Sequence, residues 1–196
     1  MEEFIQQHLQ ETLTVIKAMN DPKFISQLTA AGETLAAAAQ QRATLFIAGN
    51  GGSWADADHF AAELRAQYEI KGRVALPSMA LPISLSTLTA WGNDYNDGFE
   101  TAMKRDLEAM GRTGDVLVAI STSGKAKNVR AALLTAKDLG IQTIAISGNG
   151  PQSTDFGALA DQHIVIPSSA TAHIQEGYKA VIHVLSACMD RAAHGA

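Results

Sequence analysis

The chain has 196 residues, of which 46% are hydrophobic and 18% charged, and its formal net charge at pH 7 is −5. This length suits one domain, and an acidic chain without a Lys/Arg block argues against a nucleic-acid-binding face. No apolar run reaches the roughly 18–20 residues of a membrane span, and the acidic N-terminus lacks a signal-peptide core. The single cysteine, Cys188, has apolar neighbours and is expected to be buried and unreactive. We expect a cytoplasmic protein without membrane or nucleic-acid partners.

Two helices are predicted before the first strand, over residues 3–20 and 22–41. The first places apolar side chains, among them Phe4, Leu9 and Leu13, at helical spacing. Because both helices lie outside the α/β unit that follows, their apolar faces need another cover. A partner subunit would provide one, so residues 1–42 are expected to serve oligomerisation.

From residue 44 onward, short apolar strands alternate with helices. The predicted strands cover residues 44–48, 74–81, 115–120, 142–147 and 163–167. Pro77 interrupts the second of these, which indicates incomplete pairing or an edge position. Helices are predicted near residues 53–68, 96–111 and 171–193. Another helix follows the 115–120 strand and ends near residue 139, and a short helix follows residue 147. Residues 84–90 are expected to form a helical turn and residues 92–94 a loop. The alternation predicts a doubly wound, mainly parallel α/β sheet in a single domain.

Two of these strands end in small polar loops, Gly49-Asn50-Gly51-Gly52-Ser53 and Ser121-Thr122-Ser123-Gly124. Parallel sheets bind ligands beyond the carboxyl ends of their strands, where helix N-termini offer free N–H groups to an anion. Either loop alone could be an ordinary turn, with Ser53 as a helix N-cap. Together they predict an anion site. Trp54 breaks the G-x-G-x-x-G pattern and no Walker A lysine follows, so the loops favour a phosphate monoester such as a phosphorylated sugar.

Candidate catalytic groups lie on two helices. His59 and Glu63 share one face at i and i+4, and the last helix carries Gln175 and His183. Each also has a structural interpretation: a solvated His–Glu pair, a first-turn glutamine and a core histidine. Together the four could form an N/O metal site, although a regular helix separates Gln175 from His183 by about 12 Å.

Four segments resemble the bacterial phosphoheptose isomerases of the SIS (sugar isomerase) superfamily. They are AGNGGSWADADHFAAEL (48–64), GNDY (92–95), GDVLVAISTSGKAKNV (114–129) and HIQEGYKAVIHVL (173–185). The resemblance spans nearly the whole chain. It implies a flavodoxin-like SIS fold, a homotetramer with active sites at subunit interfaces, and zinc in some members. It also implies conversion of sedoheptulose 7-phosphate to D-glycero-D-manno-heptose 7-phosphate through an enediol, for lipopolysaccharide or related glycans.

The resemblance also implies roles for individual residues. Glu63 is implied as the base that moves the proton between C1 and C2, and His183 as its acid/base partner. The implied zinc ligands are His59, Glu63, Gln175 and His183. The phosphate end is assigned to Ser53, Ser121, Thr122 and Ser123. The remaining substrate contacts are assigned to Asn50, Gly51, Gly52, Asn93, Asp94 and Gln175.

The chain departs from the family pattern around the expected sugar site. Gln67 replaces an arginine, and Trp54 stands where a smaller residue is common. Ala126, Ala172 and Tyr178 replace a serine, an aspartate and a histidine, in that order. These changes leave open an isomerase of another ketose phosphate. A further alternative is a non-catalytic SIS protein that binds a replication initiator. The known protein of that kind lacks the catalytic glutamate, whereas this chain has both Glu63 and His183.

Overall fold

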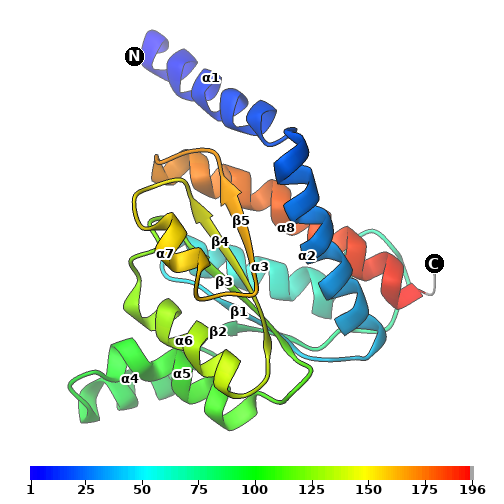
Figure 1. Ribbon diagram of the computed structural model, residues 1–196, viewed down its shortest axis with the longest axis vertical. Coiled ribbons are helices and arrows are strands. Elements are labelled where there is room, and N and C mark those ends of the chain that lie inside the picture. The colour runs from blue at the N-terminus through cyan, green and yellow to red at the C-terminus, as the bar shows by residue number, and fades with distance from the viewer. Residues whose placement is uncertain (195–196) are drawn as a thin grey trace.

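The computed structural model describes residues 1–194, which form three layers: a five-stranded sheet with helices on both faces (Figure 1). The elements in chain order are α1 (Glu2–Ala18), α2 (Pro22–Gln40), β1 (Leu45–Ala48), α3 (Gly52–Arg65), β2 (Ser78–Leu81), α4 (Leu85–Asp94), α5 (Gly98–Met110), β3 (Val116–Ser121), α6 (Lys127–Asp138), β4 (Gln142–Gly148), α7 (Ser153–Gly157), β5 (Gln162–Ile166) and α8 (Thr171–His194). The predicted α/β alternation is confirmed.

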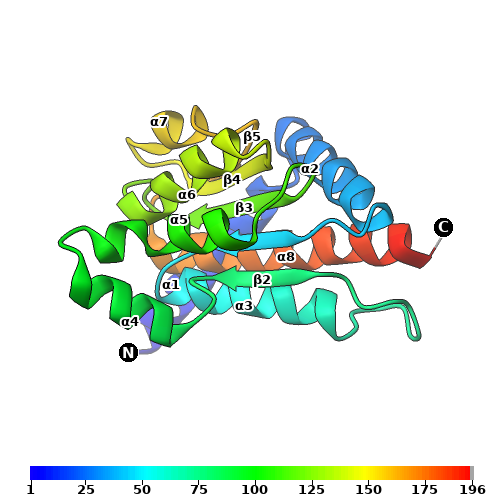
Figure 2. The same cartoon turned by 90° about the horizontal axis from the view of Figure 1, so that it is seen from below.

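All five strands are parallel, in the order β2-β1-β3-β4-β5 (Figure 2). The chain order reverses at β1, so the loops after β1 and β3 leave neighbouring strands at the same edge of the sheet. The edge position expected for the proline-containing strand is confirmed. Its predicted length was wrong, because pairing starts only at Ser78, after Pro77. Pro77 has no N–H to donate, but its carbonyl accepts a bond of 2.9 Å from the Leu45 N–H.

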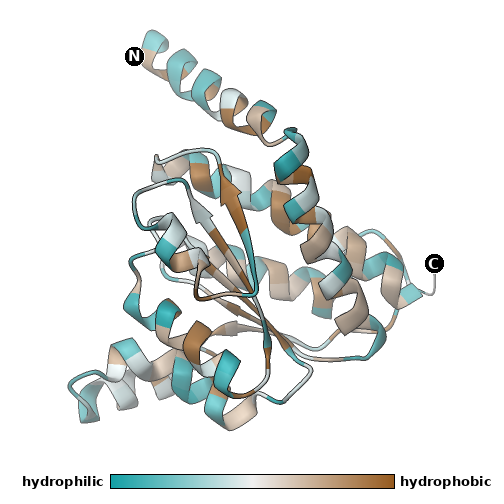
Figure 3. Ribbon diagram, viewed as in Figure 1, coloured by the Kyte–Doolittle hydropathy of each residue, from teal (hydrophilic) through white to brown (hydrophobic). Residues whose placement is uncertain are grey.

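Alternate residues of β1, β2, β3 and β4 enter two separate hydrophobic cores, whereas β5 contributes to the first of them. On β1, Leu45 and Ile47 face α2, α3 and α8, whereas Phe46 and Ala48 face α5 and α6. A parallel sheet covered on both faces requires strands that are apolar on both sides. In the hydropathy colouring, brown runs along much of β5 and along parts of the inner strands (Figure 3).

Two predicted helix boundaries were wrong. Helix α3 starts at Gly52, with Gly51 as its N-cap at φ 53°, so Ser53 lies inside the first turn and is no cap. The left-handed φ of Gly51 favours glycine at this position. Residues 92–94, expected as a loop, complete α4, whose N-cap Ser84 accepts a bond from the Thr87 N–H.

Helix α1 projects from the body of the molecule (Figure 1). Its apolar side chains Phe4, Leu9 and Leu13 are each more than half exposed, at 66%, 59% and 52%. Cys188 is only half-buried and faces Gly32 of α2, so the expected full burial was wrong. Within residues 1–194 no helix combines the length and apolarity needed to cross a bilayer.

Candidate active site

The serine-rich loop after β3 is folded by its own hydroxyl groups. The Ser121 Oγ accepts a bond of 3.1 Å from the Gly124 N–H, and the Ser123 Oγ accepts one of 3.3 Å from the Lys125 N–H. A hydroxyl that accepts a backbone bond still has its own proton to donate. Ser121 is buried, Thr122 half-buried and Ser123 exposed. The loop therefore presents hydroxyl donors from a fixed backbone at the carboxyl edge of the sheet.

A reciprocal amide pair joins this loop region to the loop after β1. The Asn50 Nδ2 donates to the Asn128 Oδ1, and the Asn128 Nδ2 donates to the Asn50 Oδ1, both over 2.8 Å. The sequence assigned Asn50 to the substrate and missed Asn128, whose only signal was its position in the first turn after the serine loop. The pair fixes the spacing of the two loops.

Gln175 lies against the start of α3. A Cβ on Gly52 would come within 2.3 Å of the Gln175 Nε2, so only glycine allows this approach. The glutamine amide therefore lies at the helix N-terminus, where free N–H groups and the helix dipole favour an anion. Ser53, in the same turn, is buried.

The predicted acid–base residues come together farther along α3. The His59 Nε2 and the Glu63 Oε1 are 3.0 Å apart. The His183 ring meets the His59 ring edge-on, with 5.3 Å between centroids, and stacks on Tyr68 at 5.7 Å. His59, Glu63 and His183 are all partly exposed, so none is a core residue. Tyr68 was missed, because it lies beyond the helix in a segment without periodicity.

Helices α3 and α8 run side by side, so the site is elongated (Figure 2). Eleven residues separate Gly52 from Glu63, about 16 Å along a regular helix. Gln175 therefore belongs to the loop end of the site and His183 to the acid–base end. The structure brings three of the four expected metal ligands together and places Gln175 apart from them.

A buried carboxyl group lies between the two ends. Asp56 is 6% exposed, one turn before His59 on α3. Burial raises its pKa, while Lys179 and His59 pull the pKa in the opposite direction. The sequence analysis missed Asp56, since a buried aspartate cannot be distinguished there from a solvated one.

A cavity of about 520 Å³ opens on the other side of the first loop. It is lined by polar Asn50 and Asn128, by exposed Trp54, and by apolar residues before and along α4 and α5. Asn93 and Asp94, at the end of α4, do not line it, and their side chains bond to each other over 3.0 Å. Within one chain the cavity therefore receives neither this pair nor the acid–base residues.

The donor atoms of the acid–base cluster are those that zinc prefers, namely imidazole nitrogen and carboxylate oxygen. In the part of the chain that the structure describes, no three His, Cys, Asp or Glu side chains gather closely enough to hold a metal ion. The donor types therefore suit zinc, but within residues 1–194 they do not form a gathered ligand set, and Gln175 lies at the other end of the site.

Two of the departures from the family pattern have structural roles. Tyr178 is fully buried, and its hydroxyl group donates to the Ile146 carbonyl over 3.5 Å. Gln67 is exposed, and its Oε1 accepts a bond of 3.3 Å from the Gly72 N–H. The polar atoms of both side chains thus bond to backbone groups away from the two loops.

Comparison with known proteins shows the family to which the chain belongs. The SIS domain family model matches residues 7–148. Phosphoheptose isomerase 1 of Campylobacter jejuni is 41% identical over 186 residues, which cover 95% of this chain and 96% of that protein. Phosphoheptose isomerase of Trichlorobacter lovleyi is 38% identical over 195 residues, covering 100% and 96%. The structure of phosphoheptose isomerase from Neisseria gonorrhoeae superimposes with a TM-score of 0.86 at 33% identity, covering 96% of this chain and 98% of that one. The chain belongs to the phosphoheptose isomerase family of SIS-domain proteins.

Proposed function

We propose that the protein interconverts sedoheptulose 7-phosphate and D-glycero-D-manno-heptose 7-phosphate in the cytoplasm, for heptose used in lipopolysaccharide or related glycans. The observation that carries the proposal is the convergence of Glu63, His59 and His183 on a family scaffold with a polar loop at the other end of α3. An aldose–ketose exchange needs these two parts, an acid–base pair and a hold on the phosphate.

In this mechanism Glu63 removes a proton from C1 of the ketose and returns it to C2 of the enediol. His183 donates a proton to the C2 oxygen as the enediol forms, and then accepts the C1 hydroxyl proton as the aldehyde forms, which restores its protonated state. His59, 3.0 Å from the Glu63 carboxylate, orients that base. The phosphate is held by Ser53, the Gly51-Gly52 turn and the hydroxyl groups of Ser121–Ser123.

The assembly is proposed to be a homotetramer with active sites shared between subunits. The exposed apolar face of α1 supports this, because such a face needs a cover. The separation of the two ends of the site along α3 also supports it, since a second subunit would bring further groups to each end. Light scattering at micromolar concentration should give four times the chain mass, and a monomer would refute the shared site.

Zinc is proposed to bind at the acid–base end through His59, Glu63 and His183. The resemblance implies Gln175 as a fourth ligand, but a single chain places Gln175 at the other end of the site. When bound, zinc would polarise a substrate oxygen as a Lewis acid. Zinc titration by calorimetry should show binding that weakens as pH falls, because both histidines must be neutral to ligate. His183→Ala should weaken it, and unchanged affinity would exclude His183 as a ligand.

A second candidate is isomerisation of another ketose phosphate. Trp54 supports it, because its side chain lines the cavity beside the first loop, at a position where the family commonly has a smaller residue. Turnover assays on a panel of ketose phosphates distinguish the two candidates. Sedoheptulose 7-phosphate should give the highest kcat/KM if the first is right, and another ketose phosphate if the second is right.

The central test is Glu63→Gln, which keeps the shape of the side chain and removes the base. We expect turnover to fall by about 10²–10⁴-fold while sugar-phosphate binding persists. Near-wild-type turnover in folded Glu63→Gln would refute the mechanism. Normal binding by wild-type protein with no turnover on any ketose phosphate would instead support the non-catalytic alternative.

A further inference from the structure

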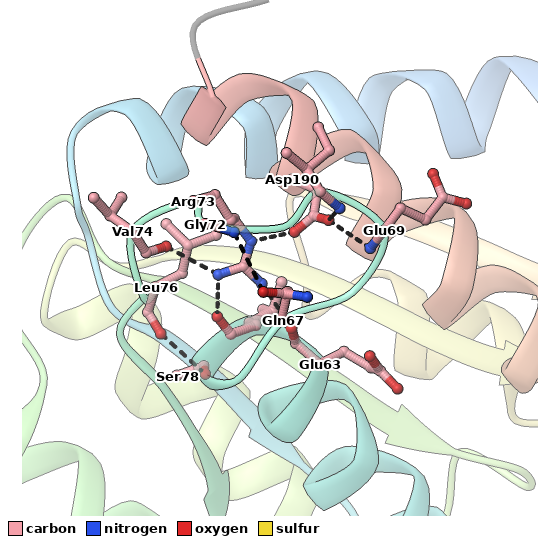
Figure 4. A network of polar contacts seen from close by, with 11 residues as sticks. Glu63, Gln67, Glu69, Gly72, Arg73, Val74, Leu76, Ser78 and Asp190 are labelled. Carbon is pink, nitrogen blue, oxygen red and sulfur yellow. Dashed lines mark hydrogen bonds and ion pairs between the residues drawn. The ribbon is translucent and has the colours of Figure 1, made fainter.

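A buried ion pair lies beside the acid–base end of the site, between the loop that follows α3 and helix α8 (Figure 4). The side chains of Arg73 and Asp190 are 0% and 1% exposed, and the Arg73 Nε donates to the Asp190 Oδ1. Neither residue was singled out from the sequence. A fully buried ion pair is weak evidence for stability, because desolvation offsets much of the attraction. Its other contacts indicate what it does.

The arginine closes the end of helix α3. Its Nη2 donates to the Glu63 carbonyl over 2.7 Å, and its Nη1 donates to the carbonyls of Leu64 and Val74 over 2.8 and 2.9 Å. The last carbonyls of a helix have no partner within the helix, and a cation there is favoured by the helix dipole. Figure 4 shows the Glu63 side chain extending away from the guanidinium that binds its carbonyl. The arginine thus fixes the backbone of Glu63 without binding its carboxylate.

The aspartate holds the segment that follows. Its Oδ2 accepts bonds of 2.8 Å from the N–H groups of Glu69 and Ile70. The residue before Glu69 is Tyr68, whose ring stacks on His183. Asp190 lies two turns after His183 on α8, so both side chains occupy the same side of that helix. The carboxylate thus fixes the backbone beside the ring that packs on His183.

We propose that Arg73 and Asp190 are positioning residues that hold Glu63 on α3 and His183 on α8 in their reactive geometry. The inference rests on the acid–base roles proposed above for those two residues. The guanidinium joins α3 to the carboxylate of α8, and the carboxylate joins α8 to the Tyr68 segment. Lysine cannot replace the arginine, because its single ammonium group cannot reach several carbonyls and the carboxylate at once.

The decisive variant replaces the pair by apolar side chains of similar size, Arg73→Met together with Asp190→Leu. Such replacements often leave a protein as stable as before, so folding should persist. Loss of the Arg73–Asp190 contacts should displace Glu63 and His183. A displacement of about 1 Å typically lowers kcat by about 10²-fold. The KM for sedoheptulose 7-phosphate should change by less than about threefold, because the phosphate loop lies about 16 Å away along α3.

Single variants cover the case in which the double variant does not fold. Arg73→Lys and Asp190→Asn should both lower kcat with little change in KM. The matched control is Asp115→Asn, since Asp115 is also buried and also accepts two backbone bonds, from Thr44 at 2.7 Å and Arg112 at 2.9 Å. Those bonds hold the segments just before β1 and β3 and involve neither Glu63, Tyr68 nor His183, so this variant should lose stability and keep kcat.

Wild-type kcat in the folded double variant would overturn the proposal. So would equal losses of kcat in Asp115→Asn and Asp190→Asn at matched loss of stability, because activity would then follow stability alone. These results differ from failure of the proposed function, which would appear as an active Glu63→Gln variant. An inactive Glu63→Gln variant with a fully active double variant removes only the positioning role.

Discussion

The two ends of helix α8 are attached to the rest of the molecule in different ways. Near its C-terminus, Asp190 and Arg73 form a network from which solvent is excluded. Near its N-terminus, buried His173 lies 3.0 Å from the Glu11 carboxylate and 2.9 Å from the Thr12 hydroxyl group of α1, and the Glu11 side chain is 50% exposed.

The difference shows what each attachment can do. A buried charged network has few alternative arrangements, so it can fix distances within an active site. An exposed carboxylate keeps most of its hydration, so its bond to a histidine adds little. The first attachment can fix side-chain geometry, whereas the second leaves the apolar face of α1 exposed.

The largest effect should follow from breaking the buried network on one side only. Asp190→Ala leaves the Arg73 guanidinium buried without its counter-ion, which typically costs about 3–5 kcal/mol. Urea unfolding at fixed protein concentration measures the change in the free energy of unfolding. The apolar double variant serves as control, because it leaves no unpaired charge. A loss below about 1 kcal/mol in Asp190→Ala would mean that water or another group compensates Arg73.

A smaller effect should appear as a pH dependence of stability. Burial pushes the pKa of Asp190 upward, but bonds from the Ile70 N–H, from Arg73 and from the Glu69 N–H outweigh it and leave the pKa below its ordinary value. A carboxyl group with a lowered folded pKa stabilises the protein above its unfolded pKa, and the contribution is lost as pH falls through the folded pKa. Melting temperatures measured from neutral pH down to pH 3 should therefore fall less steeply in Asp190→Asn than in wild type. Parallel curves would show that Asp190 contributes nothing to acid unfolding.

The smallest effect should follow from changing the exposed attachment. The pKa of Glu11 is lowered by a bond from Gln7 and next by His173, but the carboxylate is solvent-exposed. Its contribution is likewise present above the unfolded pKa and lost at lower pH, and screening by water keeps it small. Glu11→Gln should leave the melting temperature unchanged while light scattering tests whether the assembly weakens. A fall in melting temperature as large as that of Asp190→Ala would remove the contrast between the two ends of α8.

Much of the site could be predicted from local pattern. The i, i+4 spacing placed His59 and Glu63 on one helix face, and the small polar residues after two apolar strands placed two loops at one sheet edge. Sequence reasoning missed Asn128, Tyr68 and the Arg73–Asp190 pair. Their partners lie far away in the chain or in irregular segments, so no period connects them.

By itself the sequence determined the order of strands and helices, because burial on both faces of a parallel sheet requires apolar strands separated by amphipathic helices. It also determined which residue types could bind phosphate or move a proton. Only the tertiary structure decided that Gln175 packs against Gly52 while His183 packs on His59, the partner of Glu63. The physical reason is that α3 and α8 start at the same sheet edge and run side by side. Residues of the two helices therefore contact each other when they are about equally far from the start of their helix. The tertiary structure also decided that Arg73 is buried against Asp190, since a charged group is buried only where the fold supplies an opposite charge.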